Sequence, residues 1–152
     1  METTADDYAT PARLMGKPSW LLTQTAIHAH RLVSEGLAAA DARGYHYRLL
    51  AALEEFGPAS QATLGRRTAI DRSYVVEAVN ELAEGGLVER TRDPEDRRRN
   101  IITITPAGAR QLRRLDGVLA GVQDELLAPL SADERDELAR LLRRVLDHHA
   151  RG

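Results

Sequence analysis

Three consecutive arginines, residues 97–99, lie in a polar stretch of the sequence that also contains Asp96. Short runs typical of strands flank this stretch at residues 87–90 and 101–105, so the arginines are expected at the tip of a β-hairpin. Neighbouring guanidinium groups repel one another unless an anion lies close by, and the minor groove of DNA supplies such a negative potential. A salt-bridged surface loop is the alternative interpretation. The candidate DNA contacts in this hairpin are Asp96, Arg97, Arg98 and Arg99.

A second set of candidate contacts lies at the start of a predicted helix. Ser60 is a typical N-cap for a short helix, and Asp71 caps the next helix, which Gly85 ends. Two helices joined by a short turn are typical of a helix-turn-helix, in which the first residues of the second helix enter the major groove. An amphipathic helix with a solvated polar face is the alternative. The candidate contacts here are Ser60, Gln61, Arg72, Ser73, Tyr74, Glu77 and Asn80.

Aliphatic residues with helical spacing lie on both sides of this region. Residues 19–44 are expected as one helix that Gly44 ends, and a later helix begins after Thr105 with aliphatic residues every 3 or 4 positions. A capping box at Ser131 opens the last helix. These stripes exceed what a monomer of this size would cover, so we expect a homodimer, with packing inside one chain as the alternative. The candidate interface residues are Leu21, Leu115, Leu119, Val122, Leu126, Leu142 and Val145.

The order of these elements predicts a mainly α-helical fold with a small two-stranded β wing. Residues 1–17 are expected to form a flexible N-terminal arm. Residues 18–44 and 106–150 are expected to form a helical dimerisation region, and residues 45–105 a winged helix-turn-helix domain that binds DNA.

The composition excludes several classes of function. The chain has 152 residues and no cysteine, which removes disulfides, thiolate zinc sites and thiol redox chemistry. Its net charge is −2, but residues 60–114 carry +3, with eleven arginines against eight acidic residues, as suits a polyanion-binding module. Neither a membrane span nor a secretion signal is evident, so we expect a soluble, cytoplasmic protein.

Enzymatic and metal-binding motifs are also missing from the sequence. There is no nucleophile elbow, phosphate-binding loop, dinucleotide fingerprint or H-E-x-x-H motif, so we expect no enzyme and no cofactor. His28 and His30 would point to different sides of a helix, and His148 and His149 lie near the C-terminus. Neither pair has a carboxylate at a suitable spacing, so we expect no metal site.

Three segments, GLVER at residues 86–90, DPEDRR at residues 93–98 and ITITPAG at residues 102–108, resemble the wing signature of the multiple antibiotic resistance regulator (MarR) family. In the order of its helices the resemblance extends from about Trp20 to His149. It implies a homodimeric transcription factor, usually a repressor, that binds a pseudo-palindromic operator and is released by a small, often phenolic, ligand.

The resemblance also implies roles for particular residues. Arg98 matches the family's wing arginine that enters the minor groove, with Asp96 as its partner, and Ser73 and Tyr74 match positions that meet DNA. Glu77 stands where the family often has a basic residue, so it would have to accept from a cytosine amino group or orient Arg72. The family's thiol-switched peroxide sensors need a reactive cysteine, so that mechanism is excluded.

Ligands of the family bind between the dimerisation helices and the winged domain. The aromatic cluster at residues 45–47 lies near that junction and suits a flat or anionic ligand. His28 shares a helical stripe with Leu21 and Leu32, which favours a core position for its ring. The candidate ligand contacts are Trp20, His28, Arg31, Tyr45, His46 and Tyr47.

Two other functions remain open at the level of the sequence. A winged helix can serve as a protein–protein interaction module without affinity for DNA, although a wing used that way would more often carry apolar or aromatic residues than arginines. A ligand-independent DNA-binding activator would show the same sequence features as a repressor.

Overall fold

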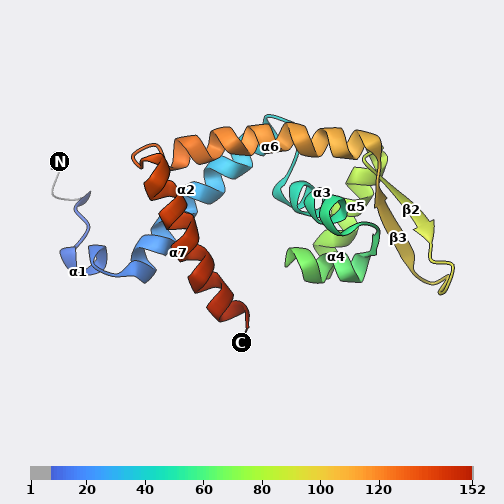
Figure 1. The fold of residues 1–152 in the computed structure, drawn as a ribbon, viewed down its shortest axis with the longest axis horizontal. Coiled ribbons are helices and arrows are strands. Elements are labelled where there is room, and N and C mark those ends of the chain that lie inside the picture. Colours follow the sequence, from blue (N-terminus) through green and yellow to red (C-terminus); the bar gives the residue numbers. More distant parts are fainter. Residues whose placement is uncertain (1–7, 152) are drawn as a thin grey trace, which may run out of the picture.

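A computed structural model describes residues 8–151 of the chain. It is mainly α-helical with one small antiparallel sheet, which confirms the predicted fold class. Figure 1 shows the long helix α6 with α2 packed beside its C-terminal half. The helices α3, α4 and α5 and the wing gather near the N-terminal end of α6. The elements are α1 (Ala12–Met15), α2 (Pro18–Ala38), α3 (Gly44–Phe56), β1 (Ala59–Ser60), α4 (Gln61–Thr68), α5 (Arg72–Glu84), β2 (Val88–Arg92), β3 (Asn100–Ile104), α6 (Pro106–Leu126) and α7 (Ala132–Ala150).

The end of α2 differs from the prediction. The helix ends at Ala38, and Gly44 begins α3 instead of ending α2, so the predicted boundary is wrong. Asp41 takes a left-handed backbone conformation with φ of 56°, and Ala40 and Ala42 on either side of it are buried. Burial of these two alanines holds the connection between α2 and α3 in place. Because this is a tertiary contact, the helical pattern of the sequence does not show where α2 ends.

The arm expected over residues 1–17 is described only in part. Residues 1–7 lie outside the described residues. Within the rest of the arm, α1 forms a short exposed helix that packs against α2. This part of the expected arm is therefore helical.

The sheet has one strand more than the predicted two-stranded wing. Its order is β1-β3-β2, and both pairings are antiparallel. Val88 pairs with Ile104 in the hairpin, while Ala59 pairs with Ile102 on the other edge of β3. A strand of two residues is too short to show an alternating pattern, so sequence analysis missed β1. It attaches the wing directly to the start of α4.

The apolar core of the winged domain lies between α3, α4, α5 and the sheet. It includes Leu49 and Leu53 of α3, Leu64 of α4, Val79 of α5 and Ile102 of β3, all buried. Burying aliphatic side chains of this size contributes roughly 1.5–3 kcal/mol each. The sheet and the three helices are thereby fixed relative to one another.

A second buried cluster joins α2 to α6. Leu115 of α6 is 0% exposed and packs with Leu37, and Val122 is buried along the same seam. Gly36 allows the close approach, because a Cβ atom there would lie 2.8 Å from Cγ2 of Val122. The prediction that Leu115 and Val122 form a dimer interface is therefore wrong, because both belong to the core of a single chain.

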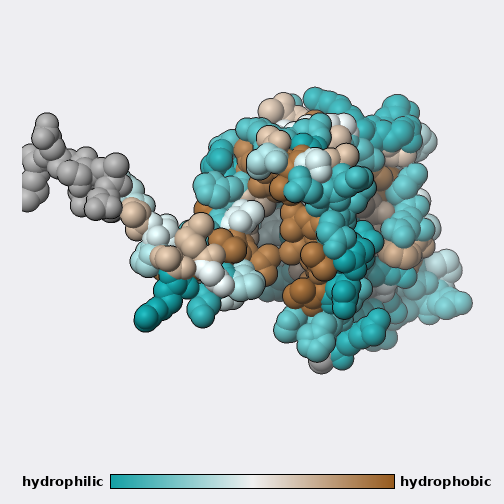
Figure 2. Space-filling view, turned by 60° about the vertical axis from the view of Figure 1, so that its left-hand side comes forward, coloured by the Kyte–Doolittle hydropathy of each residue, from teal (hydrophilic) through white to brown (hydrophobic). Residues whose placement is uncertain are grey.

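Exposed apolar side chains gather instead at the end of the molecule built from α1, α2 and α7. Figure 2 shows a band of apolar residues at this end, bordered by polar ones. Leu21, Leu142 and Val145 of the predicted interface belong to this exposed set, whereas Leu119 and Leu126 are half-buried. No helix among the described residues has the length and apolarity needed to cross a bilayer. The exposed apolar residues here are Leu14, Met15, Leu21, Leu22, Ile27, Leu141, Leu142, Val145 and Leu146.

Candidate nucleic-acid interface

The turn between α4 and α5 sets the position of the first residues of α5. The Ser60 hydroxyl caps α4 by accepting from the backbone N–H of Thr63 at 3.2 Å. Ala69 ends α4 in a left-handed conformation with φ of 55°, and Ile70 is buried behind it. The predicted helix-turn-helix is thus present, with α5 as its second helix.

The two faces of α5 divide as the sequence predicts. Val75, Ala78, Val79 and Leu82 are buried and hold the helix against the core. The opposite face is solvent-exposed, and its first turn carries hydrogen-bonding side chains and one cation. The predicted contacts on this exposed face are Arg72, Ser73, Tyr74, Glu77 and Asn80.

Asp96 fixes Arg98 at the tip of the wing. Its Oδ1 atom accepts from the backbone N–H of Arg98 at 3.1 Å and from the Arg98 Nε at 3.2 Å. These bonds hold the pKa of the Asp96 carboxyl below its usual range. The Arg98 side chain is still 91% exposed, and Arg97 beside it is exposed too. The hairpin therefore presents an arginine whose Nε is held by Asp96 while the rest of its guanidinium reaches into solvent.

Ser60 does not point outward as predicted, whereas Arg99 is exposed but hydrogen-bonded to it. Ser60 is only 6% exposed, and its hydroxyl is used by the cap of α4. Arg99 donates from Nη2 to the same hydroxyl at 3.1 Å. The contact ties the wing to α4, with Ser60 buried beneath it and Arg99 still exposed at the surface. Gln61, next to them, is half-buried.

A second tie joins the wing to α5. Arg90 of β2 donates from Nη2 to the side-chain oxygen of Asn80. The wing and α5 are consequently held as one surface, with β1 and Arg99 bracing it from the side of α4.

Glu77 and Glu81, on the side of α5 that faces α3, share an arginine. Arg43, the residue before α3, donates to Glu81 and lies 3.8 Å from Glu77. Arg43 therefore balances the negative charge of Glu77, whereas the sequence analysis offered Arg72 as the partner.

His46 has a structural position and does not face a cavity. Its Nδ1 accepts the backbone N–H of Arg43 at 3.1 Å, so the neutral ring carries its hydrogen on Nε2. Nε2 lies 2.7 Å from Oε2 of Glu81 and donates to it. The ring therefore caps α3 and binds α5, and it does not line the cavity beside α3.

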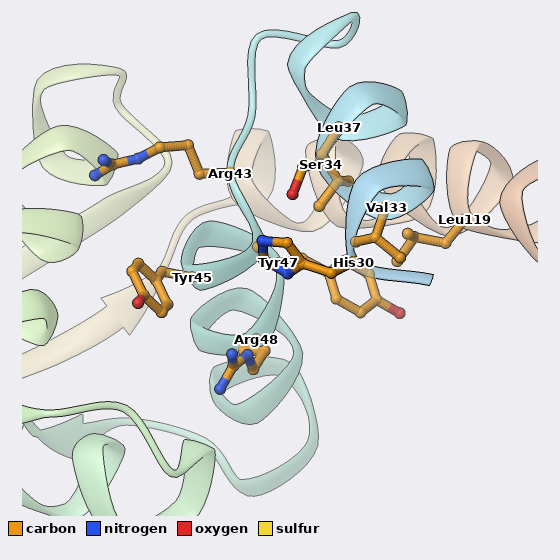
Figure 3. A pocket seen from close by; sticks show the side chains of 10 residues that line it. His30, Val33, Ser34, Leu37, Arg43, Tyr45, Tyr47, Arg48 and Leu119 are labelled. Atoms are coloured by element: carbon orange, nitrogen blue, oxygen red, sulfur yellow. The ribbon is translucent and has the colours of Figure 1, made fainter. Parts of the chain in front are cut away.

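A cavity of about 330 Å³ lies where α2, α3 and α6 meet (Figure 3), within the usual size range of small-molecule sites. Of the six predicted ligand contacts only Tyr45 and Tyr47 line it. Figure 3 shows the Arg43 side chain turned away from the centre of the group. The lining residues are His30, Val33, Ser34, Leu37, Arg43, Gly44, Tyr45, Tyr47, Arg48 and Leu119.

The other predicted ligand contacts lie elsewhere. Trp20 is half-buried near the start of α2, and Arg31 forms an ion pair with Glu35 at 3.4 Å. His28 is exposed, so its expected core position is also wrong. Sequence analysis missed His30, although its spacing from Val33 and Leu37 on one helix face could have indicated it.

Tyr47 connects the cavity to α6. Its hydroxyl donates to Oδ1 of Asp116 at 2.6 Å. This hydrogen bond, burial and the negative charge of Asp116 raise the pKa of Tyr47 to about 12. Tyr47 thus stays protonated in the cavity wall and anchors α3 to α6.

Metal chemistry has no support in the described part of the chain. Across residues 8–151 the His, Asp and Glu side chains do not form a group of three suited to a metal ion. The rings of His148 and His149 contact each other edge to face, with centroids 5.0 Å apart.

Comparison with known proteins identifies the family of the chain. Residues 41–99 match the model of the MarR family. Over 98 residues the chain is 35% identical to the HTH-type transcriptional repressor NicR of Pseudomonas putida, and this alignment covers 64% of the chain and 62% of NicR. The chain therefore spans less than two thirds of the length of this curated relative.

Solved structures match the chain over a larger share of its length. The PcaV transcriptional regulator of Streptomyces coelicolor, solved in complex with its natural ligand, superposes with a TM-score of 0.73 and 33% identity, over 91% of this chain and 96% of PcaV. A cysteine-to-serine variant of MarR from E. coli, complexed with operator DNA, shares the fold with a TM-score of 0.73 and 22% identity, over 91% of this chain and 99% of that one. Since the family model falls on the helix-turn-helix and wing, and PcaV is matched over nearly its whole length, the chain belongs to the MarR family of transcriptional regulators, which are DNA-binding proteins and not enzymes.

Proposed function

We propose that the chain is a homodimeric repressor that binds a pseudo-palindromic operator and leaves it when a small aromatic anion fills the cavity beside α3. The observation that carries the proposal is the hydrogen bond from Arg90 to Asn80, because it joins the wing and α5 into one surface. The exposed cations Arg72, Arg97 and Arg98 lie on these two elements. Such a surface favours a polyanion over a protein partner.

In this proposal the first turn of α5 enters the major groove. Ser73 and Tyr74 meet base edges or phosphates, and Arg72 pairs with a guanine or a phosphate. Arg98 enters the neighbouring minor groove, with Asp96 holding its base. Glu77 is tolerated near the phosphates because Arg43 lies beside it.

The exposed apolar end of the molecule supports the homodimer. A groove there, between α2, α6 and α7, is lined by Leu22, Leu126, Leu138 and Leu142. A second copy that packs on this end buries the aliphatic residues of both chains, which a soluble monomer rarely leaves exposed together. Two-fold symmetry then presents two α5 helices to sites about one DNA turn, roughly 34 Å, apart.

The chemistry of the cavity supports an aromatic anion as the ligand. Its lining residues include no carboxylate, while His30 and Arg48 supply nitrogen donors and Tyr45 and Tyr47 supply ring faces. The first turn of α3 lines this cavity and also holds α5 through His46 and Glu81. A ligand that displaces this turn favours an arrangement of α5 that no longer fits DNA. NicR is a transcriptional repressor and PcaV was solved with its natural ligand, and both facts agree with the proposal.

Footprinting on the DNA upstream of the chain's own gene tests both parts of the proposal. We expect two symmetric protected half-sites, which benzoate and para-hydroxybenzoate release and the neutral benzamide does not. The variant His30→Gln should respond less to both carboxylates while it still protects the DNA. Protection that neither carboxylate changes would contradict the ligand, and a single unsymmetric footprint would contradict the dimeric operator complex.

A further inference from the structure

The rings of Tyr45 and Tyr74 are stacked. Their centroids lie 5.5 Å apart and their planes differ by 23°, an arrangement in the favourable range for aromatic pairs. Tyr45 lies in the first turn of α3 and is half-buried, whereas Tyr74 lies in the first turn of α5 and is 50% exposed. One ring of the pair thus belongs to the scaffold and the other to the proposed DNA surface.

Arg48 holds the scaffold side of this pair. Its guanidinium carbon lies 5.5 Å from the centroid of the Tyr45 ring. Its Nη1 also donates to the backbone oxygen of Thr68, at the end of α4, at 3.0 Å. Contacts therefore run from the end of α4 through Arg48 and Tyr45 to the start of α5.

We propose that Tyr45 is a positioning residue for DNA binding, which acts by holding the ring of Tyr74 in the orientation that meets DNA. This inference rests on the proposed function, in which the first turn of α5 enters the major groove. A side chain that is ordered only on binding loses rotamer freedom at that step, whereas the stack orders Tyr74 beforehand. Loss of the stack therefore weakens operator binding, although Tyr45 itself does not contact DNA.

A double-mutant cycle measures this effect on the full-length chain. The variants are Tyr45→Leu, Tyr74→Leu and the two combined, and each is titrated with the footprinted upstream duplex and with a random duplex. Each single change should raise the operator Kd roughly three- to tenfold, the cost of one side chain immobilised on binding. The double variant should bind about as tightly as Tyr74→Leu alone, because the ring that Tyr45 orients is then gone.

Three further variants separate positioning from general damage to the fold. Tyr45→Phe keeps the ring and should bind like the wild type. Phe56→Leu removes a ring from the other end of α3 that is 57% exposed and lies against Arg67, and it should leave the operator Kd unchanged. Tyr45→Gln replaces Tyr45→Leu in the cycle if the leucine variant melts below the wild type.

Several outcomes would overturn the proposal. If the effects of Tyr45→Leu and Tyr74→Leu on the operator Kd were additive, the two tyrosines would act independently. A Tyr45→Phe variant as weak as Tyr45→Leu would assign the role to the hydroxyl group. Unfolding of both Tyr45→Leu and Tyr45→Gln would make Tyr45 a core residue. Failure of the proposed function would look different, because the wild type itself would then bind both duplexes alike.

Discussion

Arg99 donates from Nη2 to the hydroxyl of Ser60 at 3.1 Å, and this contact links the end of the wing loop to the cap of α4. The preceding arginine, Arg98, is instead held by Asp96 of the same loop, and its side chain reaches into solvent. The two adjacent arginines are therefore held differently, Arg99 by the cap of α4 and Arg98 within the wing loop.

Replacing Arg98 should weaken DNA binding without changing stability. We expect Arg98→Ala to raise the operator Kd about tenfold or more, because a groove contact and its counterion release are lost. The melting temperature should stay near the wild-type value, since the side chain is almost fully exposed. Fluorescence anisotropy and thermal melting measure the two quantities.

Arg140→Ala is the matched control for Arg98→Ala. Arg140 also pairs with a carboxylate, since its Nε lies 2.9 Å from Glu137, but it lies on α7, away from the wing. The Arg140→Ala variant should therefore bind the operator with an unchanged Kd. A large fall in the melting temperature of Arg98→Ala would assign Arg98 a structural role instead.

Ser60→Ala should lower the free energy of unfolding, which Arg98→Ala is expected to leave unchanged. Loss of the N-cap should cost about 0.5–2 kcal/mol of unfolding free energy. Arg99→Ala should lose part of the same free energy, and the double variant should lose less than the sum, because both changes remove one shared contact. Urea unfolding measures all three. Strict additivity would contradict the shared contact.

Local signals in the sequence were sufficient to predict several of the helices and the wing hairpin. Ser131 and Glu134 form the predicted capping box, and the exposed face of α5 follows directly from its helical period. The pairing of Asp96 with Arg98, which the family resemblance implied, is also confirmed, and both partners lie in one turn.

Contacts between distant segments could not be predicted in this way. The aliphatic seam of α6 shows that Leu115 is buried, but not that its partner is Leu37 of the same chain. His30, Arg43 and Arg48 line the cavity only because three helices meet there. A helical period identifies a face, whereas the neighbour of that face depends on the tertiary fold.

The two leucines that the sequence placed in one interface should behave differently. Leu142→Asp should give a folded monomer, because the side chain is exposed in a single chain and is buried only by the proposed partner. Leu115→Asp should unfold the chain, because it buries a charge in the core. Light scattering and circular dichroism distinguish these states. A dimeric Leu142→Asp protein would remove this residue from the interface.

Tyr47 should ionise only in strong alkali. Its pKa of about 12 in the folded chain exceeds the value of 10.0 for free tyrosine. Because the folded pKa is the higher one, the stability that the Tyr47 hydroxyl contributes is complete below pH 10.0 and is lost as the pH rises toward about 12.

Tyrosinate absorbance during a pH titration follows this ionisation. The ionisation step at the highest pH should be missing from the titration of Tyr47→Phe. In Asp116→Asn it should move to lower pH, because the carboxylate that opposes ionisation is gone. If Tyr47 ionised at the value for free tyrosine, the hydrogen bond to Asp116 would not persist in solution.

The central claim is that the surface of α5 and the wing recognises a specific DNA sequence. The most direct test is a salt titration of binding to the chain's own upstream DNA, with a random duplex as the control. We expect log Kd to rise steeply and linearly with log salt, and the upstream duplex to bind about a thousandfold more tightly than the control. Equal, weak binding to both duplexes would contradict the claim.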